Sequence, residues 1–162
     1  MISILDWVGW VTSVIFLLTL ISGIYAWIKG ILPALIRLGN GLASRKIAIF
    51  AKGDQLRSLE DLLVGSKLFQ KKNLIGISSE SDFDQAERAT LFLVVWQDWQ
   101  DHLTDILNAK RVHTALVVYA PPGSIPPERM KDLDGKRNVI VVNFRGRLLN
   151  DIVTSLMTTG YQ

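Results

Sequence analysis

Hydrophobic positions along this chain form two regions with different patterns. The first runs from Trp7 to Ile28, 22 residues without a charged side chain, with Trp or Tyr near both ends. A helix of that length reaches about 33 Å, enough to cross a hydrocarbon core of about 30 Å. Indole and phenol rings favour the headgroup level on either side. The pattern therefore predicts a transmembrane anchor over residues 1–29.

A cleaved signal peptide fits this segment poorly, because no Lys or Arg precedes the apolar run and the run is too long. A buried or interfacial helix is the other alternative. Basic residues follow the segment at Lys29, Arg37, Arg45 and Lys46, whereas Asp6 precedes it. By the positive-inside rule we expect a single-pass protein of the inner (cytoplasmic) membrane with its C-terminal domain in the cytoplasm.

Residues 30–44 stay apolar but admit Pro33 and Arg37 before Gly39, Asn40 and Gly41. This predicts a juxtamembrane helix or linker that bends near the proline and ends at the glycines. Its apolar residues either form a self-association face or lie on the headgroups as an amphipathic connector. The sequence leaves both open.

The second region, residues 45–162, alternates short β-branched runs with helical patterns. The strands are expected at residues 46–51, 74–78, 89–96, 114–119 and 138–144. The helices are expected at residues 54–69, 82–88, 98–110, 126–133 and 147–159. Continuous apolar strands indicate a parallel sheet with helices on both faces. We therefore predict one α/β domain, a doubly wound five-stranded parallel sheet.

Composition narrows the function classes. The chain carries 18 basic and 15 acidic residues, a net charge of +3, and the basic residues are dispersed, so nucleic acid is not an expected partner. With no cysteine, and with His102 and His113 in no metal-ligand motif, neither a metal nor another cofactor is expected. The expected partner is the lipid bilayer.

Ligands of such sheets bind at the carboxyl ends of the strands, near the point where the strand order reverses. The loops at that edge supply the candidate ligand-binding residues: Lys52, Gly53, Asp54, Ser78, Ser79, Gln97, Asp98, Arg145 and Arg147.

The two arginines stand where the last helix opens, so guanidinium groups and helix N–H groups together could hold a phosphodiester. Alternatively, Arg147 pairs with Asp151 one turn on and Arg145 lies on the surface. Asp54 is equally interpreted as the N-cap of the first helix of the domain.

A second cluster comprises Asp98, Asp101, His102 and Asp105 within two helical turns. It could bind a metal or transfer protons, although a solvated, acid-rich helix start is the commoner arrangement. Nearby, Trp96 is expected in the core and Trp99 as an exposed stacking or interface residue.

Three segments carry a resemblance: residues 45–50 (RKIAIF), 86–95 (AERATLFLVV) and 145–149 (RGRLL). With the order of elements, residues 45–160 resemble flavodoxin-like TIR-like and receiver-like domains, and are similar to CARF sensors of cyclic oligonucleotides. The flavodoxin-like resemblance implies the strand order 2-1-3-4-5. An anchor joined to such a domain resembles the membrane effectors of bacterial antiphage defence. That resemblance implies a homo-oligomer that a cyclic nucleotide or other nucleotide signal assembles, and whose helices perturb the membrane.

The chain departs from the catalytic members. No glutamate lies between Glu87 and Glu128, where NAD-cleaving TIR domains place one, and Arg145 stands where a receiver needs a lysine. We therefore expect no catalytic residues. Two alternatives stay open, a membrane-tethered recruitment module without a ligand and a TIR-type NAD hydrolase.

Overall fold

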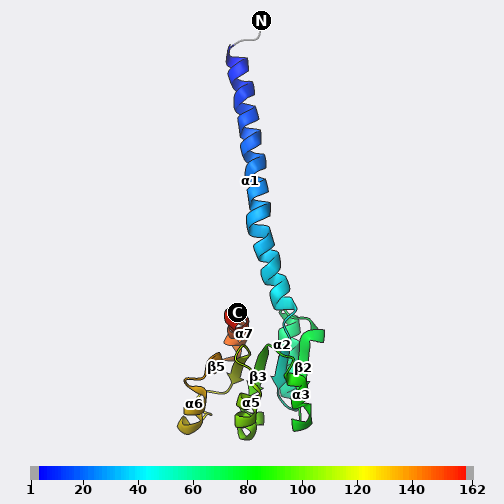
Figure 1. Cartoon of the computed structure of the whole chain (residues 1–162), viewed down its shortest axis with the longest axis vertical. Helices are drawn as coiled ribbons and strands as arrows, with labels where there is room; N and C mark the ends of the chain where they lie inside the picture. Colours follow the sequence, from blue (N-terminus) through cyan, green and yellow to red (C-terminus); the bar gives the residue numbers. More distant parts are fainter. Residues whose placement is uncertain (1–3, 160–162) are drawn as a thin grey trace. The chain divides into compact units, whose positions relative to one another are not determined.

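The computed structural model describes the backbone of residues 4–159, and the side chains of residues 7–33, 39, 42 and 44–159. The chain divides into two compact units, one up to Asn40 and one from Gly41 (Figure 1).

The first unit is formed by the helix α1 (Ile4–Ala43), whose last three residues belong to the second unit, and α1 continues through Pro33. Residues Trp7–Pro33 have a mean hydropathy of 2.0 and are long and apolar enough to cross a membrane. The predicted helix end at Gly39, Asn40 and Gly41 is wrong, because the helix runs on to Ala43. Glycine permits a left-handed helix end but does not impose one, and inside a helix it costs only about 1 kcal/mol.

The serine and threonine hydroxyl groups of α1 donate to backbone carbonyl groups within the helix. Thr12, Ser13 and Thr19 each donate to the carbonyl oxygen four residues earlier, at 2.8, 2.9 and 2.8 Å, and Ser22 donates to Leu18 in the same way. Near the C-terminal end of the apolar segment, the Lys29 ammonium lies 4.8 Å from the centre of the Tyr25 ring. A hydrocarbon environment thus leaves none of these hydroxyls without a partner.

The second unit is a five-stranded parallel sheet with the order β2-β1-β3-β4-β5, which confirms the predicted order. Its strands are β1 (Ile47–Phe50), β2 (Leu74–Ile77), β3 (Leu91–Val95), β4 (Ala115–Tyr119) and β5 (Val139–Val142). Its α-helices are α2 (Gly53–Gly65), α3 (Phe83–Ala86), α4 (Trp96–Trp99), α5 (Leu103–Ala109), α6 (Pro127–Leu133) and α7 (Arg145–Thr159), and short 3₁₀ turns are η1 (Lys71–Asn73), η2 (Glu80–Asp82) and η3 (Gln100–His102).

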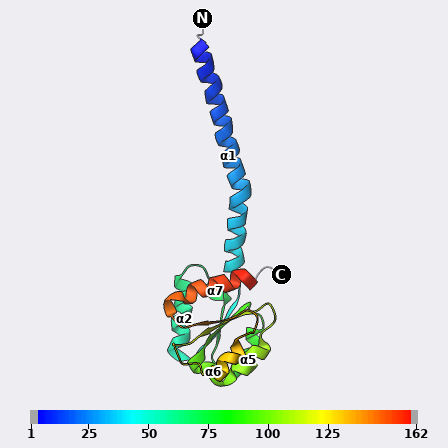
Figure 2. The same cartoon turned by 90° about the vertical axis from the view of Figure 1, so that its left-hand side faces the viewer.

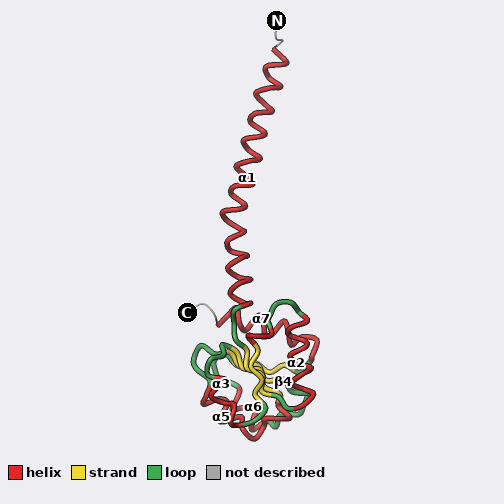
Figure 3. Tube along the Cα trace, turned by 90° about the vertical axis from the view of Figure 1, so that its right-hand side faces the viewer, coloured by secondary structure: helices red, strands yellow, loops and turns green. Residues whose placement is uncertain are grey.

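Helices cover both faces of the sheet, as the apolar strands predict. In Figure 3 the strands run between α2 on one side and α3 and α5 on the other. Alternate strand residues point to opposite faces. Phe50, Phe92 and Leu116 join the core under α3 to α6, while Ile49 and Leu93 join the core under α2 and α7. Both layers lie within a single α/β domain.

Two predicted helices of this unit are broken where the sequence pattern indicates a continuous helix, and its other helices differ from the prediction by one to two residues at an end. The first ends at Gly65, and Lys67 then takes a φ of 60°, which breaks the helix before residue 69. The helix predicted over residues 98–110 already starts at Trp96 and is interrupted by the 3₁₀ turn η3. Apolar periodicity continues through both breaks, and for this reason the sequence pattern did not reveal them.

Candidate functional site

The strand order reverses between β1 and β3, and the crevice at their carboxyl ends is bridged by the protein itself. The backbone N–H of Lys52 donates to the Asp98 carboxylate at 2.9 Å. Because α2 begins at Gly53, this carboxylate stands at the positive end of the helix, where an anionic ligand would otherwise bind. Lys52 is the N-cap residue and Asp54 lies in the first turn, so the interpretation of Asp54 as the N-cap is wrong.

Trp99 forms the apolar side of this crevice. It is 1% exposed, and its ring lies 5.6 Å from that of Phe50 and 5.4 Å from that of Phe83. The Lys52 ammonium lies 5.1 Å from the centre of the indole ring. The expectation of an exposed Trp99 is wrong, because the single turn of α4 directs both of its tryptophans inward, while the expectation that Trp96 is in the core is confirmed at 2% exposure. The indole Nε1 of Trp99 is buried without a hydrogen-bond partner.

The loop after β2 is organised separately. The Ser79 hydroxyl donates to Asp82 at 2.9 Å and forms a capping box with it. Next to it, His102 Nε2 lies 3.3 Å from Glu80, and Nδ1 lies 3.9 Å from Asp105. Among the described residues no group of three His, Cys, Asp or Glu side chains could hold a metal ion. Within the acidic cluster, His102 contacts Glu80 of η2 and Asp105 of α5, and Asp98 accepts from Lys52.

Arg145 connects α7 to α2, which cover the same face of the sheet. Its guanidinium donates to the Ser58 hydroxyl at 2.6 Å and to the Ser58 carbonyl at 3.0 Å, joining α7 to α2 across 87 residues (Figure 2). Arg147 pairs with Asp151 at 4.0 Å, one turn on, as the alternative interpretation had it. Arg145 therefore lies on the surface and also makes a specific contact with Ser58, which the sequence pattern did not reveal.

Arg147 and Asp151 also line a small polar pocket at the end of β5, with a volume of about 130 Å³. Pockets that enclose a small molecule usually measure about 300–1,000 Å³. At about 130 Å³ this pocket is smaller than that range.

The candidate residues therefore fall into three places. Lys52, Gly53 and Asp98 meet at the crevice beside Trp99, Ser79 belongs to the capped turn after β2, and the two arginines lie by α2 and the pocket of β5. Ser78 and Gln97 are exposed. Ser58 was not predicted as part of the site, because its partner Arg145 lies 87 residues away along the chain.

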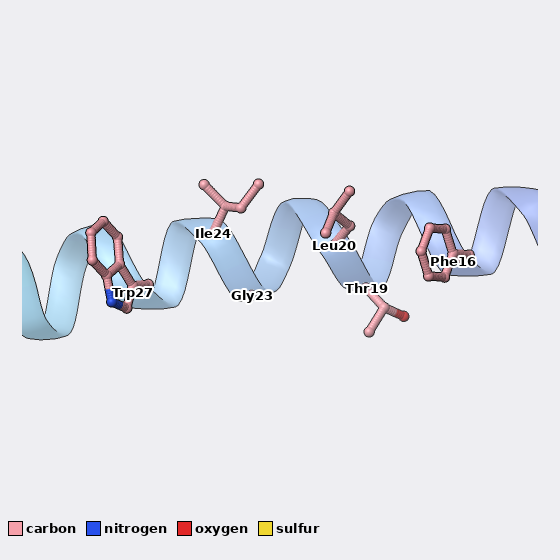
Figure 4. Close-up of a pocket in the computed structure, with 6 residues that line it drawn as sticks. All are labelled: Phe16, Thr19, Leu20, Gly23, Ile24 and Trp27. Carbon is pink, nitrogen blue, oxygen red and sulfur yellow. The ribbon is translucent and has the colours of Figure 1, made fainter.

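A further feature lies on α1. An apolar hollow runs along one side of the helix where Gly23 leaves the backbone uncovered (Figure 4). It is lined by Phe16, Thr19, Leu20, Gly23, Ile24 and Trp27. A Cβ atom added at Gly23 would meet nothing within 4 Å.

Comparisons with known proteins give little beyond the fold. No family model matches the chain, and no curated protein matches it. A solved structure of the E. coli constitutive lysine decarboxylase is similar over 71% of this chain, with 14% identity and a TM-score of 0.49. The match spans 17% of that decarboxylase chain.

Proposed function

We propose that this protein is a membrane-anchored, oligomerising effector of antiphage defence. In this proposal the α/β domain is cytoplasmic and senses a nucleotide-derived signal, and the transmembrane helices perturb the inner membrane. The observation that carries it is the pairing of an exposed, membrane-length apolar helix with a small α/β domain. A single helix cannot form a pore, but assembly of the soluble domains concentrates the helices in one patch of bilayer.

Two features support assembly over a monomeric sensor. The pocket beside Arg147 is smaller than a usual nucleotide site, and in this proposal a second copy supplies the remaining groups that hold the signal. The hollow at Gly23 allows another apolar helix to approach the backbone closely. Ligand binding and helix packing would then both require the same association.

The test is expression of the full-length protein in bacteria while a voltage-sensitive dye reports membrane potential. We expect depolarisation that a variant lacking residues 1–43 does not cause. Gly23→Leu fills the hollow and keeps the segment apolar, so it should reduce the effect, whereas Ile21→Leu, at an exposed position that does not line the hollow, should not. Full depolarisation by Gly23→Leu would contradict assembly through this face.

The role of Arg145 needs a matched control because the residue also joins two helices. Arg145→Glu should abolish the response to the trigger. Ser58→Ala removes one of the helix contacts while leaving the cation in place, and it should retain the response. If both variants respond like the wild type, the arginines do not bind the signal.

A second candidate is a membrane-tethered recruitment module that binds no ligand. The Asp98 carboxylate occupies the N-terminus of α2, and Arg145 is engaged by Ser58, so both candidate anion sites are satisfied internally. This function predicts unchanged membrane potential and capture of the same partner by wild type and by Arg145→Glu. The TIR-type hydrolase stays a weaker alternative, since acids in the segment after β3 are aspartates.

A further inference from the structure

Charge in the α/β unit is divided between the two edges of the sheet. The parallel strands begin in one row: Ile47 is level with Leu74 and Leu91, and Leu91 with Ala115. The five connections that lead into the strands therefore meet at one edge, which we call the entry edge. They comprise residues 44–46, 66–73, 87–90, 110–114 and 134–138.

The entry edge is strongly cationic. Its connections hold ten of the chain's 18 basic residues and two of its 15 acidic ones. The ten are Arg45, Lys46, Lys67, Lys71, Lys72, Arg88, Lys110, Arg111, Lys136 and Arg137, and the two acids are Glu87 and Asp134. The connections that leave the strands hold one basic residue, Lys52, and two acidic ones, Glu80 and Asp82, before the next α-helix begins. After β3, α4 and η3 follow directly and add Asp98 and Asp101.

Most of this positive charge is directed to solvent. Lys71, Lys72, Lys136 and Arg137 are exposed, and the one ion pair described within the entry connections joins Arg111 to Glu87 at 3.5 Å. Every strand has a basic residue shortly before it. Since neighbouring strands lie about 4.8 Å apart, the cations form a row roughly 20 Å wide.

Two apolar side chains stand among these cations. Val112 is 63% exposed and Leu68 is 41% exposed. Cations with interspersed apolar side chains suit the headgroup region of an anionic bilayer, where the charges meet lipid phosphates and the apolar groups enter the boundary with the acyl chains.

The proposed membrane anchor keeps the α/β unit close to such a bilayer. Residues 34–46 separate the apolar segment from β1, and 13 residues reach at most about 45 Å even when extended. We propose that the entry edge docks on anionic phospholipid headgroups of the membrane that holds α1. This inference rests on the proposed membrane anchoring of α1.

The experiment uses the full chain, which has no cysteine, with one cysteine introduced as Val112→Cys and labelled with an environment-sensitive fluorophore. Pro122→Cys, at the opposite end of β4, is the matched position. Each protein is reconstituted in phosphatidylcholine nanodiscs with or without about 30% phosphatidylglycerol. We expect a blue shift at position 112 with the anionic lipid, lost at high salt, and no change at position 122.

Charge reversal identifies the surface. Each cation near an anionic surface contributes a factor of about five to the docking equilibrium, so Lys71→Glu with Lys72→Glu should reduce docking by at least about 25-fold. Arg57→Glu with Arg129→Glu changes the net charge equally on helices outside the entry edge and should leave docking unchanged.

The outcomes separate this inference from the anchor itself. If the protein resists extraction by alkaline carbonate but position 112 does not respond to lipid charge, the docking inference is wrong and the anchor stands. If the protein is extracted, the anchor fails. Tight binding of a mixed-sequence DNA duplex in phosphatidylcholine nanodiscs, lost on the Lys71 and Lys72 reversal, would overturn docking in favour of a nucleic-acid surface.

Discussion

Removal of the Asp98 carboxylate tests whether the crevice between β1 and β3 is held closed by the protein. The carboxylate accepts the Lys52 N–H at 2.9 Å at the N-terminus of α2. Loss of such a hydrogen bond costs about 1 kcal/mol, and loss of the negative charge at the helix end adds about 0.5 kcal/mol. Asp98→Ala should therefore destabilise the α/β unit by about 1.5 kcal/mol. Asp98→Asn keeps an acceptor oxygen and loses only the charge, so it should cost about 0.5 kcal/mol.

Thermal unfolding followed by tryptophan fluorescence in detergent measures this effect directly. Trp96 and Trp99 are the tryptophans of the α/β unit, both are buried, and both lie within two residues of Asp98. For a domain of this size, 1.5 kcal/mol corresponds to a Tm lower by about 5 °C. Asp101→Ala makes the same charge change at an exposed position and should shift Tm by less than about 1 °C. Equal shifts for the Asp98 and Asp101 variants would refute the reasoning.

Three further predictions concern local contacts of the α/β unit. Asn138 has a φ of 60°, and its side chain donates to the Val112 carbonyl at 3.0 Å. Measured by urea unfolding, Asn138→Ala should lower the free energy of unfolding by about 2 kcal/mol, because both the hydrogen bond and the tolerance of this φ are lost. Asn138→Gly, which tolerates this φ, should lower it by about 1 kcal/mol. Arg145→Ala should lower the free energy of unfolding by about 1 kcal/mol. In a double-mutant cycle, the double variant with Ser58→Ala should lose less stability than the sum of the two single losses. Burial lowers the pKa of Lys110 from 10.5, so just below pH 10.5 the unfolded chain binds more protons at this residue than the folded chain does. In that pH interval the stability of the wild type relative to Lys110→Gln should therefore rise with pH. A difference between the two proteins that does not change with pH would contradict this.

Much of the fold could be predicted because the signals are local. A run such as residues 91–95 (LFLVV) is apolar throughout, as a strand covered on both faces requires, and all of these residues are buried. Element ends were less predictable where a conformation depends on single residues. Lys67 adopts a positive φ that its residue type does not favour, and nothing in the local pattern distinguishes it from a helical lysine.

The candidate site was harder to predict because its contacts join distant parts of the chain. The rule for parallel sheets located the crevice, and Lys52 and Asp98 do meet there, 46 residues apart. The rule cannot say whether a loop carboxylate or a ligand occupies the helix N-terminus. The inward orientation of Trp99 and the contact between Arg145 and Ser58 depend on how the helices pack against the sheet. The packed structure is needed to see either of them.

The clustering of positive charge at one edge of the sheet was also not predictable from the order of residues alone. Along the sequence the basic residues are dispersed, and a net charge of +3 indicates no particular partner. A parallel sheet, however, returns the chain to the same edge before every strand, so residues separated by 20 or more positions become neighbours in one row. A pair such as Lys71 and Lys72 is unremarkable alone, but repeated before successive strands it builds a cationic surface. In parallel α/β domains, charge is therefore better counted separately for the connections that enter strands and for those that leave them.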